Sequence, residues 1–168
     1  MKKIYNKQSA IATTHGFTLI EILIVVAIIA ILASSVLVGF GPAQKQGRDA
    51  RRISDLRQVQ NALEIYYAKC GYYPGGVQAA TPCSSSFSAT TDWAGLKTAL
   101  KGSTIGINNV PDDPSANKTY SYATDATGST YVIKAVFEDV NNPALRDSYK
   151  TDFNGVTCTG TTDYCVRF

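Results

Sequence analysis

The apolar residues of this chain follow two different patterns, which predict two kinds of helix. From Phe17 to Val38 nearly every residue is apolar, and Glu21 is the only ionisable side chain. At about 1.5 Å per residue, a helix of this length extends roughly 33 Å, enough to cross the hydrocarbon core of a membrane. We therefore expect residues 17–42 to form an apolar helix that spans a membrane or lies in the core of an assembly.

The second pattern lies between residues 43 and 70. Apolar residues recur there at three- and four-residue spacing, which places them on one face of an amphipathic helix. These residues are Ile53, Leu56, Val59, Leu63, Tyr66 and Cys70. Charged residues take the remaining faces. We expect the basic run Arg48–Arg57 to be solvated or to face another subunit, with its arginines pairing with Asp49 and Asp55.

Gly39–Pro42 separates the two patterns with two glycines and a proline. Residues of this kind permit a kink or local melting where neighbouring groups satisfy the backbone. The alternative is that the first helix ends here and a loop follows.

The rest of the chain alternates between turn signals and short periodic runs. Gly71–Gly76 ends the long helix with glycine and proline. Asp92–Leu100 reads as a short helix with Asp92 as its N-cap and Trp93 facing the core. Alternating aromatic and aliphatic residues then predict strands at Lys118–Thr124 and Thr130–Glu138, joined by a hairpin turn.

A last short pair of strands is expected at Val156–Cys158 and Tyr164–Phe168. The predicted fold class is therefore α+β, with a long N-terminal helix packed on a small antiparallel sheet. The globular domain is expected over residues 43–168. It comprises the amphipathic helix 43–70, a loop and short helix over 71–110, and the sheet with a C-terminal loop over 111–168.

The net charge of +3 arises at the N-terminus. Lys2, Lys3 and Lys7 lie within the first 16 residues, where no acid occurs; removing these three from the 16 Lys and Arg leaves 13, equal to the 13 Asp and Glu. A basic start before an apolar run is typical of segments held on the cytoplasmic side of a membrane. Because the remaining chain is balanced, nucleic acid is not expected as its main partner.

Four cysteines, Cys70, Cys83, Cys158 and Cys165, form an even set without a C-x-x-C pair. Behind an export signal this set predicts disulfides rather than zinc binding. Three pairings are possible, and proximity in sequence favours Cys70–Cys83 and Cys158–Cys165. Each would close a short loop and contribute about 2–3 kcal/mol in the chain-entropy model.

The sequence offers no catalytic site. Its only histidine, His15, precedes the apolar run, and no phosphate-binding loop, His-Glu-x-x-His pair or Gly-x-Ser-x-Gly elbow occurs. We expect neither an enzyme nor a cofactor. Oxygen-bearing side chains of the kind that Ca²⁺ binds gather near the C-terminus, but their spacing matches no loop consensus. They are Glu138, Asp139, Asn141, Asn142, Asp147, Asp152 and Asn154.

Glu21 distinguishes three interpretations of the N-terminus. A secretory signal cut near Ala33–Ser35 and a plain membrane anchor both fit the basic start and the apolar run. Neither has a use for a carboxylate inside the apolar helix, where its burial is costly. An ionisable residue in such a segment indicates a function, and its partner should be identifiable.

The stretch Gly16-Phe17-Thr18-Leu19-Ile20-Glu21, followed by the long apolar run, closely resembles the N-terminus of the type IV prepilin family, which includes pseudopilins. The resemblance implies a pilin-like fold and a leader, residues 1–16, that a prepilin peptidase removes after Gly16. Phe17 would become the N-methylated first residue, and its ammonium would pair with Glu21 of a neighbouring subunit.

The same resemblance implies a function and a set of partners. The chain would be a structural subunit that polymerises through its N-terminal helix into a pilus or pseudopilus. An inner-membrane platform and an assembly ATPase would serve this assembly. The subunit would be a single-pass protein of the cytoplasmic membrane and later part of an extracellular pilus or of a periplasmic or cell-wall pseudopilus. The alternative is a minor or tip pilin that binds DNA, a surface or a secreted substrate.

Overall fold

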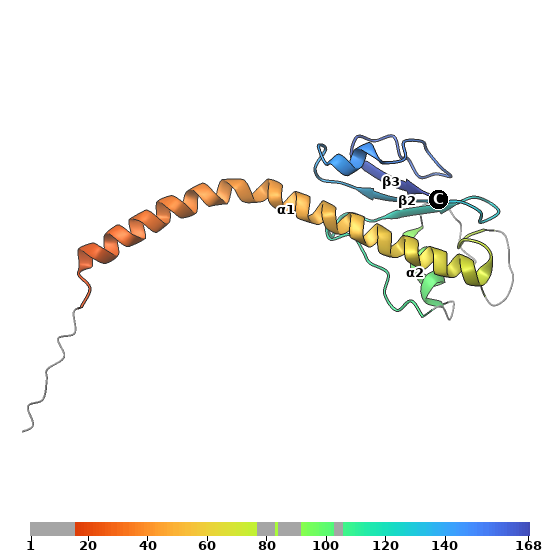
Figure 1. Ribbon diagram of the computed structural model, residues 1–168, viewed down its shortest axis with the longest axis horizontal. Helices are drawn as coiled ribbons and strands as arrows, with labels where there is room; N and C mark the ends of the chain where they lie inside the picture. The colour runs from red at the N-terminus through yellow and green to blue at the C-terminus, as the bar shows by residue number, and fades with distance from the viewer. Residues whose placement is uncertain (1–15, 77–82, 84–91, 103–105) are drawn as a thin grey trace, which may run out of the picture. The chain divides into compact units, whose positions relative to one another are not determined.

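The computed structural model describes residues 16–76, 83, 92–102 and 106–168 (Figure 1). The chain divides into two units, with the boundary between Phe40 and Gly41. Helix α1, Leu19–Cys70, contributes its first part to one unit and its second part to the other. The second unit also holds the remaining elements of the fold.

Helix α1 continues through the predicted interruption. Its 52 residues include Pro42, and residues 39–42 are helical, so the expectation that the helix ends here is wrong and local melting is not seen. A proline removes one backbone donor from the helix, whereas the hydrogen bonds before and after it can persist. Among the described residues, no helix is both long enough and apolar enough to cross a membrane. The membrane span expected over residues 17–42 is therefore not confirmed.

The sheet is small and antiparallel, as predicted. Its order is β1 (Ser121–Thr124), β2 (Tyr131–Val136) and β3 (Asp163–Arg167). Ser121 lies opposite Lys134, and Lys134 lies opposite Cys165 on the other side. The chain is thus an α+β protein with a long N-terminal helix and a three-stranded sheet.

The last strand pairs differently from the prediction. Tyr164–Phe168 was expected beside Val156–Cys158, but β3 pairs with β2 instead. Val156 forms an isolated bridge with Phe153, closing the turn of the C-terminal loop. Cys158 is joined to β3 by a disulfide rather than by backbone pairing, which explains why the two segments are neighbours without forming a ladder.

Both strands of the predicted hairpin are shorter than expected because competing hydrogen bonds end them. The amide of Glu138 donates to both carboxylate oxygens of Asp49, at 3.0 and 3.2 Å, so β2 ends before this residue. Before β1, at the predicted start of this strand, Lys118 N–H donates to the carbonyl of Ser115 in a turn.

The predicted apolar face of α1 forms the core of the second unit. Leu56, Val59, Leu63 and Tyr66 are at most 1% exposed, and Ile53 and Cys70 pack against them partly buried. The opposing face of the sheet contributes Tyr122, Tyr131 and Ile133 to the same cluster. Figure 1 shows this part of α1 running alongside the sheet.

Tyrosines supply much of this core, and their hydroxyl groups find partners at its margins. Tyr120 donates to the Asp55 carboxylate at 2.8 Å, and Tyr122 donates to the carbonyl of Pro74 at 2.8 Å. Burial, with the carboxylate beside it, raises the pKa of Tyr120 well above its ordinary value. These aromatic rings therefore provide buried apolar area without leaving an unsatisfied hydroxyl.

Helix α2, Trp93–Gly102, is confirmed with the expected cap. Asp92 accepts a hydrogen bond from the amide of Gly95 at 2.8 Å, which satisfies a donor of the first turn. Trp93, Leu96 and Leu100 are buried in the core, and the Trp93 indole packs edge-on against Tyr120.

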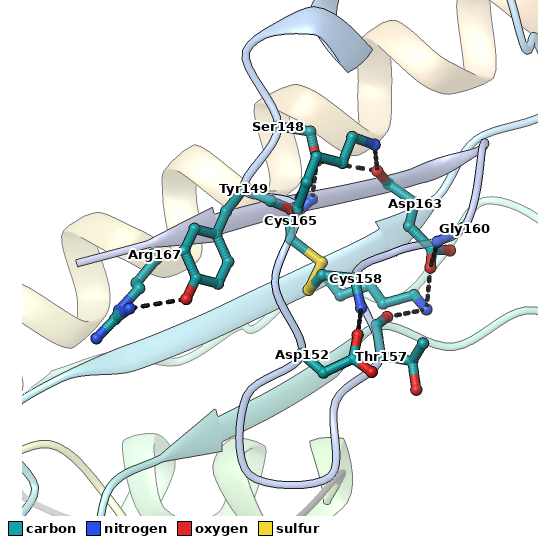
Figure 2. The surroundings of a disulfide bond; sticks show 11 residues. Ser148, Tyr149, Asp152, Thr157, Cys158, Gly160, Asp163, Cys165 and Arg167 are labelled. Carbon is teal, nitrogen blue, oxygen red and sulfur yellow. Dashed lines mark hydrogen bonds and ion pairs between the residues drawn. A yellow bond between two sulfur atoms is a disulfide. The ribbon is translucent and has the colours of Figure 1, made fainter.

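The other face of the sheet is covered by the C-terminal loop. Ala123, Val132 and Val156 form a second apolar cluster around the disulfide Cys158–Cys165, whose surroundings are drawn in Figure 2. A second disulfide joins Cys70, the last residue of α1, to Cys83. The structure therefore shows the pairing that sequence proximity favours.

The hairpin turn lies directly against the end of α1. Gly128 adopts a φ of 71°, and a Cβ at this position would lie 2.9 Å from the Cβ of Tyr72. Its carbonyl accepts a hydrogen bond from Tyr73 N–H at 2.8 Å. Only glycine satisfies both the left-handed conformation and the close approach.

Candidate functional site

The start of α1 is built around Thr18 and Glu21. The Glu21 carboxylate accepts hydrogen bonds from the backbone amide of Thr18, at 2.8 Å, and from its hydroxyl, at 2.7 Å. In return, the Thr18 hydroxyl accepts from the amide of Glu21 at 3.3 Å. This reciprocal arrangement is a capping box, which satisfies donors that the first turn of a helix leaves free.

Gly16 and Phe17, the predicted processing residues, precede this first turn. Neither belongs to the helix, and the Phe17 side chain is 83% exposed. Phe17 is bonded directly to Thr18, whose amide binds the Glu21 carboxylate. The structure therefore brings Phe17, Thr18 and Glu21 together at one helix end, and leaves the Gly16–Phe17 bond outside regular structure.

Beyond the cap, the first part of α1 exposes apolar side chains on every face. Large hydrophobic residues from Leu19 to Leu32 are between 50% and 82% exposed. They are Leu19, Ile20, Ile22, Leu23, Ile24, Val25, Val26, Ile28, Ile29, Ile31 and Leu32. Exposed apolar surface of this extent is characteristic of a segment that another surface covers.

The second part of α1 holds an ion network of which the sequence pattern predicted only the local pairs, Arg52 with Asp49 and Arg51 with Asp55. The run Arg48–Arg57 was expected to be solvated or to face another subunit, yet the Arg52 side chain is fully buried within its own chain. Its guanidinium binds Asp49 at 2.7 Å, Asp113 at 2.8 Å and Glu138 at 2.9 Å. Arg48 also binds Glu138. The expectation failed because residues from the distant segments at 113 and 138 cover this part of the helix.

The network changes the protonation behaviour of its members. Hydrogen bonds from Arg48 and Arg52 hold the pKa of Glu138 well below its usual range. For Asp113, burial alone would raise the pKa, but hydrogen bonds from Arg52 and from the amide of Ser115 outweigh it and lower the pKa. Both carboxylates are therefore charged at neutral pH. The network links α1 to the segment that precedes β1, through Asp113, and to the segment that follows β2, through Glu138.

The oxygen-rich residues considered for Ca²⁺ are dispersed rather than gathered. Glu138 binds Arg48 and Arg52, Asp152 accepts from Cys158 N–H, and Asn154 donates to the carbonyl of Thr124. Asn142 accepts from the amide of Ala144 and so caps a short 3-10 helix. In the described parts of the chain, no three His, Cys, Asp or Glu side chains form a group suited to a metal ion.

Residues 12–37 match the family model described as the prokaryotic N-terminal methylation motif. The chain therefore carries a prokaryotic N-terminal methylation motif, the prepilin-type motif expected from its sequence. Gly16, Phe17, Thr18 and Glu21 all lie within the matched stretch, so the capped start of α1 coincides with the prepilin-type motif.

The chain is also similar to two curated proteins named type II secretion system core protein G. It is 36% identical over 60 residues to the protein of Escherichia coli (strain K12), a match that covers 36% of this chain and 41% of that protein. It is 34% identical over 59 residues to the Aeromonas hydrophila protein, covering 35% and 41%. The chain thus spans about two fifths of the length of these relatives. No solved structure matches it.

The capping role of Thr18 at this site was not predicted, although Thr18 is part of the quoted motif. A Thr three residues before a Glu at the start of an apolar run is the sequence signature of a capping box, so the signal was present. The prepilin-type motif therefore combines two features in six residues, a helix start and a carboxylate held at that start.

Proposed function

We propose that this chain is the precursor of a pilin-like structural subunit, most similar in kind to a pseudopilin, and not an enzyme. A prepilin peptidase cuts after Gly16 and methylates Phe17, and the subunit then polymerises through the first part of α1. The observation that carries this proposal is the apolar surface of Leu19–Leu32, with a single carboxylate, that of Glu21, in its first turn.

Burial of this surface requires an apolar environment at each stage. Before assembly, the apolar segment lies in the cytoplasmic membrane; after assembly, the same segments of neighbouring copies cover one another in a pilus or pseudopilus. A platform in the inner membrane and an assembly ATPase serve the transfer between the two. Removing this much apolar surface from water supplies the driving force for either environment.

Glu21 has a defined part in this account. In the precursor, its carboxylate accepts from the amide and hydroxyl of Thr18. Cleavage after Gly16 creates a charged amine on Phe17, one residue from this cap, on each mature subunit. An ammonium from a neighbouring copy then neutralises the carboxylate, which reduces the cost of burying both charges.

The proposal is tested by intact-mass and N-terminal analysis of the protein from its native host. We expect a chain that begins at Phe17 with one added methyl group and two disulfides. A Gly16→Ile variant should keep the full precursor mass, whereas the matched Gly41→Ala variant, beyond the motif, should be processed normally. A chain cut near Ser35, or wild-type protein left uncut, would overturn the proposal.

A further inference from the structure

The second unit contains a hollow of about 540 Å³ that the assembly of the subunit does not explain. One wall is the turn after β2 together with the 3-10 helix η1, Pro143–Arg146; the other is the segment 159–161 just before β3. Lys150 also lines the hollow. All of the residues that line the hollow belong to the described part of the second unit.

The charged side chains that line this hollow are all cations. Its lining includes Arg146 and Lys150 but no Asp or Glu. Elsewhere in this unit, Arg48, Arg52 and Lys97 are paired with carboxylates, whereas exposed cations such as Arg57 and Lys101 form no ion pair within the described residues. Within the described residues, no ion pair is formed by Arg146 or Lys150. The two cations that line the hollow are therefore not paired with a carboxylate of the described chain.

The position of Lys150 is fixed without neutralising it. Its ammonium donates to the backbone carbonyl of Asp163 at 3.0 Å. The carboxylate of Asp163 is occupied by Lys134, at 2.9 Å, and by the amide of Gly160, at 3.0 Å. In Figure 2, Gly160 is labelled beside the carboxylate of Asp163, to which its amide donates. The nearby acid is thus bound by other donors.

The remaining polar lining consists of groups that can donate hydrogen bonds. Thr159 and Thr161 contribute hydroxyl groups, and Asn141 contributes a carboxamide. Asn142 uses its side-chain oxygen to accept from Ala144 N–H, at 3.0 Å, so its amide hydrogens are left for another acceptor. Cations combined with neutral donors match the oxygens of carboxylate, phosphate and sulfate groups.

Both walls are held in place before any ligand binds. Leu145, in η1, is 8% exposed and packs into the main core. The disulfide Cys158–Cys165 ties the start of the opposite wall to β3. A site whose walls are already ordered loses less conformational freedom on binding.

We propose that this hollow is a binding site for an anionic group, carboxylate, phosphate or sulfate, on a small molecule or a surface polymer. The cations Arg146 and Lys150 hold the charge, and Asn142, Thr159 and Thr161 orient the oxygens. The same C-terminal region that suggested Ca²⁺ from its sequence thus presents a site of the opposite charge preference.

Titration of the full chain in neutral detergent, followed by ¹H–¹⁵N NMR, tests the proposal. The probes are sodium phosphate, sodium sulfate and sodium galacturonate, with ionic strength held constant by NaCl and glucose as the uncharged comparison. We expect saturable shifts of the amides of residues 141, 142, 159 and 161 with at least one anion, and none with glucose. The anion that binds most tightly distinguishes a free inorganic ion from an acidic sugar.

A double variant, Arg146→Gln with Lys150→Gln, should weaken binding at least tenfold. The matched control, Arg57→Gln with Lys101→Gln, removes two exposed cations outside the hollow and should bind as the wild type does. Unchanged amide shifts elsewhere in both variants show that the fold is retained. Shifts that do not saturate, or that persist in the Arg146/Lys150 variant, would overturn the proposal as non-specific ion effects. Because processing at Gly16 is not involved, this outcome is independent of the proposed assembly.

Discussion

The two parts of α1 use apolar residues in opposite ways. In the part before Gly41, large apolar side chains are at least 50% exposed wherever their exposure is described, and they occur on all faces. In the part from Gly41 to Cys70, most large apolar side chains lie on one face, where Leu56, Val59, Leu63 and Tyr66 are at most 1% exposed; Ile65 and Tyr67 are exposed. The second part is therefore folded against the sheet and α2 of its own unit, whereas the first part leaves its apolar side chains exposed.

Charged residues differ between the two parts as well. The first part holds Glu21 alone, bound to Thr18 at the helix start. The second part places Asp49 and Arg52 inside a network that reaches Asp113 and Glu138. Directional ion pairs fix one position of the second part against the sheet. Apolar contact alone is non-directional, so a single carboxylate at the start of the first part would set its register against a neighbour.

The largest expected effect on the second part comes from Arg52→Leu. The substitution removes the cation between three carboxylates, so we expect a loss of about 3–5 kcal/mol in the free energy of unfolding. Urea unfolding followed by fluorescence of Trp93, the only tryptophan, reports on this unit. Exposed Arg57→Leu is the control and should change stability by less than about 0.5 kcal/mol. Equal effects of the two substitutions would show that the network does not fix the helix.

A pair of Leu→Ala variants tests the comparison directly. Leu63 is 0% exposed, and its truncation leaves a cavity that should cost about 2–5 kcal/mol of unfolding free energy. Leu23 is 60% exposed, so Leu23→Ala should leave the Trp93 unfolding transition within about 0.5 kcal/mol of wild type. If the proposed assembly is correct, Leu23→Ala instead lowers the yield of sheared filaments. A loss of stability from Leu23→Ala similar to that from Leu63→Ala would erase the distinction between the two parts.

Removal of the disulfide Cys158–Cys165 should lower the stability of the second unit, by less than the two substitutions above, and leave the first part of α1 unaffected. Cys158→Ser with Cys165→Ser opens a short loop, and we expect a loss of about 2–3 kcal/mol in the chain-entropy model. Because the loop covers only the sheet, N-terminal processing of the precursor should be unchanged. Urea unfolding gives the first quantity and intact mass the second. Stability equal to wild type would mean that the loop is ordered without the disulfide.

Acidification should have the smallest effect of these tests: the free energy of unfolding should change little near pH 7 and fall increasingly at lower pH. The pKa values of Asp113 and Glu138 are lower in the folded chain than in the unfolded chain. Their contribution to stability is therefore present above the ordinary carboxyl pKa of about 4 and is lost as pH falls below it. Thermal unfolding between pH 6 and pH 2 measures this loss. The slope should be shallower in Glu138→Gln, and an unchanged slope would assign the acid sensitivity to other groups.

Periodicity predicted the elements that make mostly local or one-sided contacts. The apolar face of α1, the Asp92-capped helix α2 and the strands around Tyr122 and Ile133 follow directly from residue spacing. The buried Arg52 could not be recognised, because a charged residue on a polar face becomes buried only when segments sixty or more residues away cover it. The partner of β3 was missed for the same reason, since strand pairing depends on distant register rather than on local pattern.

At the N-terminus, the motif and its neighbours in sequence were enough to identify Gly16, Phe17 and Glu21 as candidates. Thr18 was within reach as well, because a capping box is a local signal. The hollow beside Arg146 and Lys150 could not be predicted from the sequence, because its walls are brought together by β3 and by the disulfide rather than by proximity in sequence.

The central claim is that copies of the chain cover one another through the first part of α1. Electron paramagnetic resonance of a spin label at Ile29→Cys, in filaments sheared from the native host, tests this most directly. We predict dipolar broadening that disappears when labelled chains are diluted with unlabelled ones, together with protection from an aqueous relaxation agent. A label at exposed Ala126→Cys should remain accessible to that agent. A spectrum at position 29 that is unaffected by dilution and accessible to the agent would contradict the account.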